Sequence, residues 1–61
     1  MKPTTQEQRK ALLSIYNRDW NDKPASYIEF RRMAYQSHMD CVMVPWAGMW
    51  LGIESDGYTH S

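Results

Sequence analysis

One stretch decides the fold of this chain: Cys41-Val42-Met43-Val44-Pro45-Trp46-Ala47-Gly48-Met49-Trp50-Leu51-Gly52-Ile53. It contains two short runs, residues 41–44 and 49–53, that are rich in residue types favoured in strands. The connection between them has a proline early and a glycine late, which is typical of a hairpin. The stretch therefore predicts a β-hairpin. The turn residues Ser55-Asp56-Gly57 predict a brief third strand at 58–60.

The two faces of this hairpin are both apolar, which is unusual. We expect Val44 to face Met49, and residues that oppose each other in a ribbon point to the same side. One face then carries Val42, Val44, Met49, Leu51 and Ile53, and the other carries Cys41, Met43 and Trp50. A hairpin with one face in the core alternates apolar and polar residues. We therefore expect the Met43–Trp50 side, with Trp46 at the tip, to stay partly exposed unless a partner covers it.

Two amphipathic helices are expected before the hairpin. Thr4 or Thr5 begins a capping box, and the apolar residues that follow share one side of a helix over residues 5–19. Residues 21–24, Asn-Asp-Lys-Pro, favour a turn. Ser26 with Glu29 is a second capping box, which predicts a helix that ends near Ser37. The fold class is therefore α+β, two helices followed by a hairpin, in a single small domain over 1–61.

The charge is zero overall but unevenly placed. All seven Lys and Arg lie at or before Arg32, while residues 39–61 carry three acids and no base. Arg31 falls inside the apolar arc of the second helix, where an ion pair with Asp19, Asp40 or Glu54 would offset its burial. Alternatively, Arg31 and Arg32 contact nucleic acid, because two helices joined by a short turn resemble part of a helix-turn-helix.

The sequence offers only weak candidates for a metal site or a catalytic site. The spacing His38-x-x-Cys41 is that of metal ligands, and His60 or Asp40 could join it, but structural zinc sites take two such pairs and the second is missing. A cysteine nucleophile needs a base and an orienting group, and no orienting group is evident for Cys41 with His38 or His60. Glu54 and Asp56 form a pair of carboxylates that flanks a turn. Such a pair is more often part of a solvated bend than a catalytic acid/base dyad. We expect no metal, no cofactor and no enzymatic activity.

Three segments together resemble a known group of proteins. They are the run Met43–Ser61, the early Gln8-Arg9-Lys10-Ala11-Leu12, and Tyr27-Ile28-Glu29-Phe30-Arg31-Arg32. They are similar to a family of short uncharacterised proteins from tailed bacteriophages and prophages. The resemblance implies a phage gene product in the bacterial host cytoplasm, and it implies no specific activity. Ala47 stands where the resemblance suggests a cysteine, which argues against a metal held by this loop.

The function expected is that of a small non-enzymatic phage accessory protein. It would bind a protein partner, either a host factor, a defence-system component, a phage protein or a second copy of itself, through Met43, Trp46, Trp50, Arg31 and Arg32. Nucleic-acid binding by the basic second helix and a role as a minor virion or assembly component are the alternatives.

The single cysteine excludes an internal disulfide. The chain shows neither a secretory signal nor a membrane span, so we expect a soluble protein.

Overall fold

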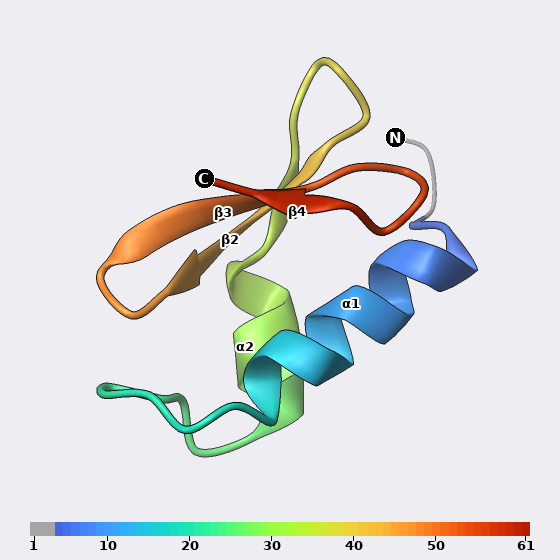
Figure 1. The fold of residues 1–61 in the computed structure, drawn as a ribbon. Coiled ribbons are helices and arrows are strands. Elements are labelled where there is room, and N and C mark those ends of the chain that lie inside the picture. The colour runs from blue at the N-terminus through green and yellow to red at the C-terminus, as the bar shows by residue number, and fades with distance from the viewer. Residues whose placement is uncertain (1–3) are drawn as a thin grey trace.

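The computed structural model describes residues 4–61 as two helices followed by an antiparallel sheet (Figure 1). The elements are α1 (Gln6–Tyr16), α2 (Tyr27–Met33), β1 (Tyr35–Gln36), β2 (Val42–Trp46), β3 (Met49–Ile53) and β4 (Thr59–His60). The sheet order is β1-β2-β3-β4, so each strand pairs with its neighbour in sequence. This arrangement confirms the α+β prediction, including the brief strand that follows the hairpin.

Helix α1 begins at the predicted capping box. The Thr5 hydroxyl accepts a hydrogen bond from the Gln8 backbone N–H at 3.1 Å, and the Gln8 side-chain oxygen accepts one from the Thr5 N–H at 2.9 Å. Each bond satisfies a donor that the first turn of a helix leaves unpaired. The helix ends at Tyr16, three residues before the predicted end, with Asn17 as its C-cap.

The prediction that the second helix continues to Ser37 was wrong. Ser26 caps α2 as expected, since its hydroxyl accepts from the Glu29 N–H, but the helix ends at Met33 and Ala34 is extended. Tyr35 and Gln36 instead form strand β1, opposite Met43 and Val42 of β2. Tyr35 and Gln36 pair with β2 in the sheet instead of forming a further turn of α2. Tyrosine is also a residue type favoured in strands.

The hairpin is closed by a tighter turn than predicted. Trp46 pairs with Met49 and Val44 with Leu51, so the connection is only Ala47-Gly48 and the predicted register was wrong by two residues. Both turn residues have positive φ, 51° and 81°, as in the two-residue turns whose twist matches that of the strands. A shift of two residues leaves every side chain on its predicted face, because strand side chains alternate with a period of two.

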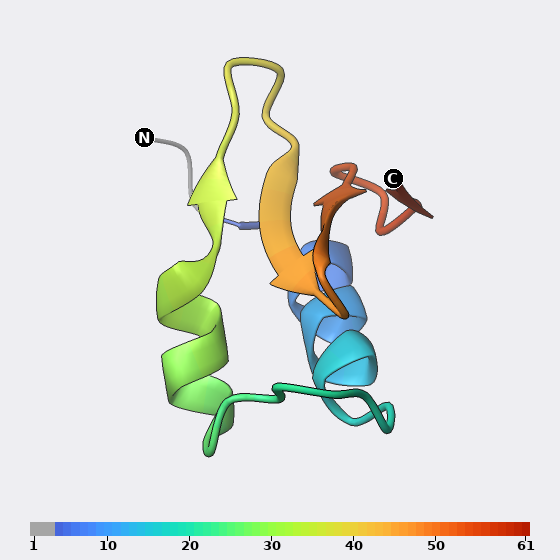
Figure 2. The ribbon, with the colours of Figure 1, turned by 90° about the vertical axis from the view of Figure 1, so that its left-hand side faces the viewer.

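One face of the sheet packs on the helices and forms the core. Val42, Val44, Leu51 and Ile53 point to this inner face and are buried with Leu12, Ile15 and Phe30. Both helices lie on this side of the sheet, as the two perpendicular views show (Figures 1 and 2). The opposite side, which we call the outer face, is covered by no helix among residues 4–61. No helix in this part of the chain is both long and apolar enough to cross a membrane.

Candidate functional site

The outer face is organised by one row of residues that crosses all four strands. The register places Tyr35, Met43, Gly52 and His60 side by side, one from each of β1 to β4. Trp50, two residues before Gly52, points to the same face. The Trp50 and Tyr35 rings meet edge to face, with centroids 5.5 Å apart, and their side chains are 50% and 54% exposed. The outer face therefore presents an aromatic pair to solvent.

The five residues predicted to contact a partner lie in three places. Met43, which is half-buried, and Trp50 share the outer face. Trp46 lies on the inner face instead, half-buried against Trp20 with ring centroids 6.2 Å apart. Arg31 and Arg32 are exposed on α2. The fold thus separates the aromatic and the basic residues that the sequence grouped together.

The ion pair expected for Arg31 does not form within residues 4–61. Its guanidinium is exposed to solvent and pairs with none of the three acids considered for it. Helix α2 is short, and Phe30 is its one buried residue. The side of the helix that packs against the core is therefore narrower than the apolar side predicted from the sequence, and Arg31 lies outside it. An exposed guanidinium needs no partner, because water solvates it.

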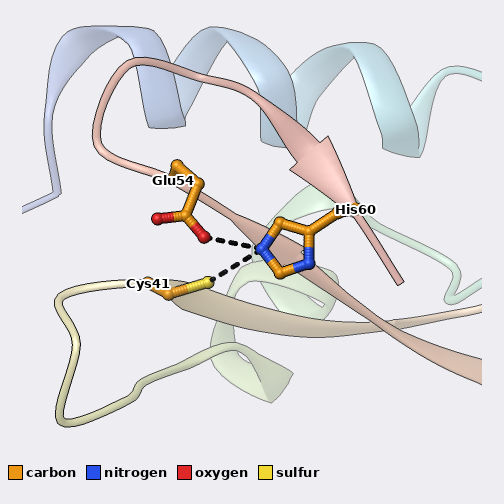
Figure 3. A group of neighbouring side chains, drawn as sticks. All are labelled: Cys41, Glu54 and His60. Atoms are coloured by element: carbon orange, nitrogen blue, oxygen red, sulfur yellow. Dashed lines mark hydrogen bonds and ion pairs between the residues drawn. The ribbon is translucent and has the colours of Figure 1, made fainter.

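Three polar side chains meet at one end of the outer face (Figure 3). The Glu54 Oε2 lies 2.6 Å from the His60 Nε2, and the Cys41 Sγ lies 4.0 Å from the same nitrogen. The strand register explains the meeting. Cys41 directly precedes β2 and Glu54 directly follows β3, so they extend the Val42–Ile53 pairing by one step, and His60 of β4 pairs with Gly52 beside them.

Gly52 provides the space in which the group assembles. A Cβ atom at this position would lie 2.8 Å from the His60 Cε1 and 2.9 Å from the Cys41 Sγ, both closer than van der Waals contact allows. Any other residue at position 52 would therefore displace the imidazole or the thiol. The absence of a side chain leaves room for the His60 ring beside Cys41, which is only 5% exposed.

Gln8 fixes the two strand ends that carry Cys41 and Glu54. Its side chain is 1% exposed, and its Nε2 donates to the backbone oxygens of Asp40 and Ile53, each at 3.1 Å. These are the residues immediately before Cys41 and Glu54. From the sequence, Gln8 is one of two candidates, with Glu7, for the last position of the first capping box, and it begins one of the segments that resemble phage proteins. Nothing in its local pattern indicates contacts with segments 32 and 45 residues away.

The electrostatics of the group favour a neutral thiol. Burial, and after it the nearby Glu54 carboxylate, raise the pKa of Cys41 above its ordinary value. The hydrogen bond with Glu54 raises the pKa of His60, because a carboxylate stabilises the imidazolium.

In a cysteine nucleophile relay the carboxylate contacts one imidazole nitrogen and the thiolate the other. Here the Glu54 carboxylate and the Cys41 thiol both lie beside Nε2, and Nδ1 lies 3.4 Å from the Ser61 oxygen. The geometry therefore differs from that relay.

Of the metal ligands considered from the sequence, the structure unites only Cys41 and His60. His38 and Asp40 lie outside the group, and Glu54 takes their place. Asp56, the other carboxylate of the pair considered from the sequence, accepts a hydrogen bond from the Tyr58 N–H within its own turn. The contact between Glu54 and His60 depends on the β3–β4 turn. That turn is closed by hydrogen bonds from the Glu54 N–H to Tyr58 and from the Gly57 N–H to Glu54.

Comparison of the chain with protein-family models, curated proteins and solved structures gave no match. The resemblance to phage proteins therefore stays a prediction.

Proposed function

We propose that this protein acts by binding a protein partner through the outer face of its sheet. The observation that carries the proposal is the Tyr35–Trp50 pair, half exposed on a face that neither helix covers. Large aromatic side chains held rigidly at a surface are the residues that most often contribute the binding energy of an interface. Met43 lies in the same surface and adds a flexible apolar side chain that adapts to a partner.

The chemistry of the outer face fits a protein better than a nucleic acid. Aromatic side chains that stack on bases lie in grooves whose positive charge follows the phosphate backbone. The outer face instead carries the Glu54 carboxylate, and the cations Arg31 and Arg32 lie on α2. Nucleic-acid binding through α2 is the alternative, supported by the exposure of both guanidinium groups beside Ile28. Following the resemblance, we place the protein in a phage-infected bacterial cell, where the partner is a host or phage protein.

Truncating Trp50 is expected to weaken partner binding without unfolding the protein. Trp50→Ala removes the larger ring of the exposed pair, and loss of such an anchor costs about 2 kcal/mol or more, roughly a thirtyfold rise in Kd. The partner is first captured from infected cells with a tagged chain, and its Kd is then measured by calorimetry. Ile28→Ala is the matched control, because Ile28 is 63% exposed but lies on α2. We expect its Kd to stay within about twofold of the unsubstituted chain.

Two results would contradict this assignment. In the first, Trp50→Ala and Ile28→Ala bind the partner equally well. In the second, the chain shifts a nucleic acid in a gel, the shift weakens steeply with salt, and Arg31→Ala with Arg32→Ala abolishes it. Recovery of the chain in purified phage particles would instead favour the virion component.

A further inference from the structure

We propose that Cys41, Glu54 and His60 bind a divalent transition-metal ion, with Zn²⁺ the ion that their chemistry favours. Cysteine sulfur, imidazole nitrogen and carboxylate oxygen are the three donor types that bind zinc in proteins. In this fold one donor of each type comes from a different strand end, and the three donor atoms lie within 4.8 Å of one another. The inference does not depend on the partner proposed above.

Two of the three distances between donor atoms are near those of a metal site, and the third, from the Cys41 sulfur to the Glu54 carboxylate, is at most 4.8 Å. Bond lengths to zinc of about 2.0–2.3 Å and tetrahedral angles place two ligand atoms roughly 3.3–3.6 Å apart. The sulfur–nitrogen distance of 4.0 Å is slightly longer than this, and the nitrogen–oxygen distance of 2.6 Å is shorter, as a hydrogen bond requires. Small rotations of the partly exposed Glu54 and His60 side chains bring the donors to the metal spacing. Binding releases the thiol proton and the proton between Glu54 and His60.

The grouping of the three donor atoms around one nitrogen also supports a metal site. The Glu54 carboxylate and the Cys41 thiol approach the same imidazole nitrogen (Figure 3). With the carboxylate and the thiol both beside Nε2, the three donor atoms form a compact triangle, and a cation at its centre would be within reach of all three. The backbone keeps these positions, since Gln8 ties the two strand ends together and Gly52 leaves room for the ring. His60 and Glu54 are partly exposed, so water can complete a fourth coordination position.

The test is a titration of the reduced full chain with Co²⁺, which reports its ligands by absorption, followed by competition with Zn²⁺. We expect one ion per chain, a thiolate-to-cobalt charge-transfer band and the intense visible bands of a four-coordinate ion, all displaced by Zn²⁺. Cys41→Ser should abolish the charge-transfer band. His60→Gln and Glu54→Gln, both at partly exposed positions that tolerate substitution, should each weaken binding by about tenfold or more.

Three further variants separate this site from other ways of binding metal. His38→Ala and Asp56→Asn alter residues of the same types outside the group, and each should bind Co²⁺ within about twofold of the unsubstituted chain. Gly52→Ala removes no donor but displaces His60 and the Cys41 sulfur, so it should weaken binding while circular dichroism shows the fold retained. The proposal is overturned if the unsubstituted chain gives no charge-transfer band. It is equally overturned if both His60→Gln and Glu54→Gln bind normally, or if His38→Ala weakens binding as much as His60→Gln.

Discussion

Replacing Gln8 by glutamate is expected to lower the free energy of unfolding by about 3 kcal/mol or more, because a buried acceptor that loses its donor costs about 1–3 kcal/mol. Glutamate has the same shape and keeps the oxygen that accepts from Thr5, but it has no N–H to donate to the backbone oxygens of Asp40 and Ile53. It also brings a carboxylate toward two carbonyls in a position that is 1% exposed. Urea denaturation followed by circular dichroism measures the loss.

The matched control for this substitution is Gln6→Glu. Gln6 is exposed in the first turn of the same helix, where a negative charge interacts favourably with the helix dipole. We expect its unfolding free energy to stay within about 0.5 kcal/mol of the unsubstituted chain or to rise slightly. Equal stability of the two variants would show that the Gln8 side chain does not tie the strand ends together.

Phe30→Ala is expected to lower the free energy of unfolding by about 3–5 kcal/mol, the range found for truncating a buried aromatic residue. Phe30 is fully buried between the helices and the inner face, and its ring contacts those of Tyr16, Trp20 and Tyr27 at centroid distances of 5.5, 5.8 and 6.5 Å. A core in a chain of this length supplies only about 3–5 kcal/mol, so we expect the variant to be largely unfolded at room temperature.

Met33→Ala is the control for Phe30→Ala, since Met33 ends the same helix with 49% of its side chain exposed. Its effect should stay below about 1 kcal/mol by the same denaturation measurement. A Phe30→Ala chain that unfolds at the same urea concentration as Met33→Ala would mean that the aromatic cluster is not the centre of the core.

The sequence was sufficient for the architecture because its strongest signals are local. The capping boxes at Thr5 and Ser26 begin both helices, and the strand-forming run from Cys41 to Ile53 forms the hairpin. Even the wrong register preserved the two faces, since an error of two residues leaves the alternation of side chains unchanged. The exposure of Trp50 could thus be predicted without the correct turn.

The remaining features depend on contacts between distant segments. Strand β1 exists because Tyr35 and Gln36 pair with β2, and no local pattern separates these two residues from the preceding helix. The sequence predicts a four-residue turn, 45–48, with Trp46 at an exposed tip. In the structure the turn is Ala47-Gly48, and Trp46 lies in β2 and packs against the core. The union of Cys41 with Glu54 and His60 follows from the register of three strands, which the sequence alone does not fix.

The central claim is that the outer face of the sheet is open to solvent, and the three tryptophans provide the most direct test. A soluble gadolinium chelate broadens the NMR signals of protons that it can approach, and a Trp50→Phe variant assigns the indole signals of residue 50. The Trp20 and Trp46 indole nitrogens are buried, whereas the Trp50 side chain is half exposed. We expect strong broadening of the Trp50 ring protons and protection of the Trp20 and Trp46 indole N–H signals in dilute samples. Protection of Trp50 equal to that of the other two, persisting on dilution, would contradict this claim.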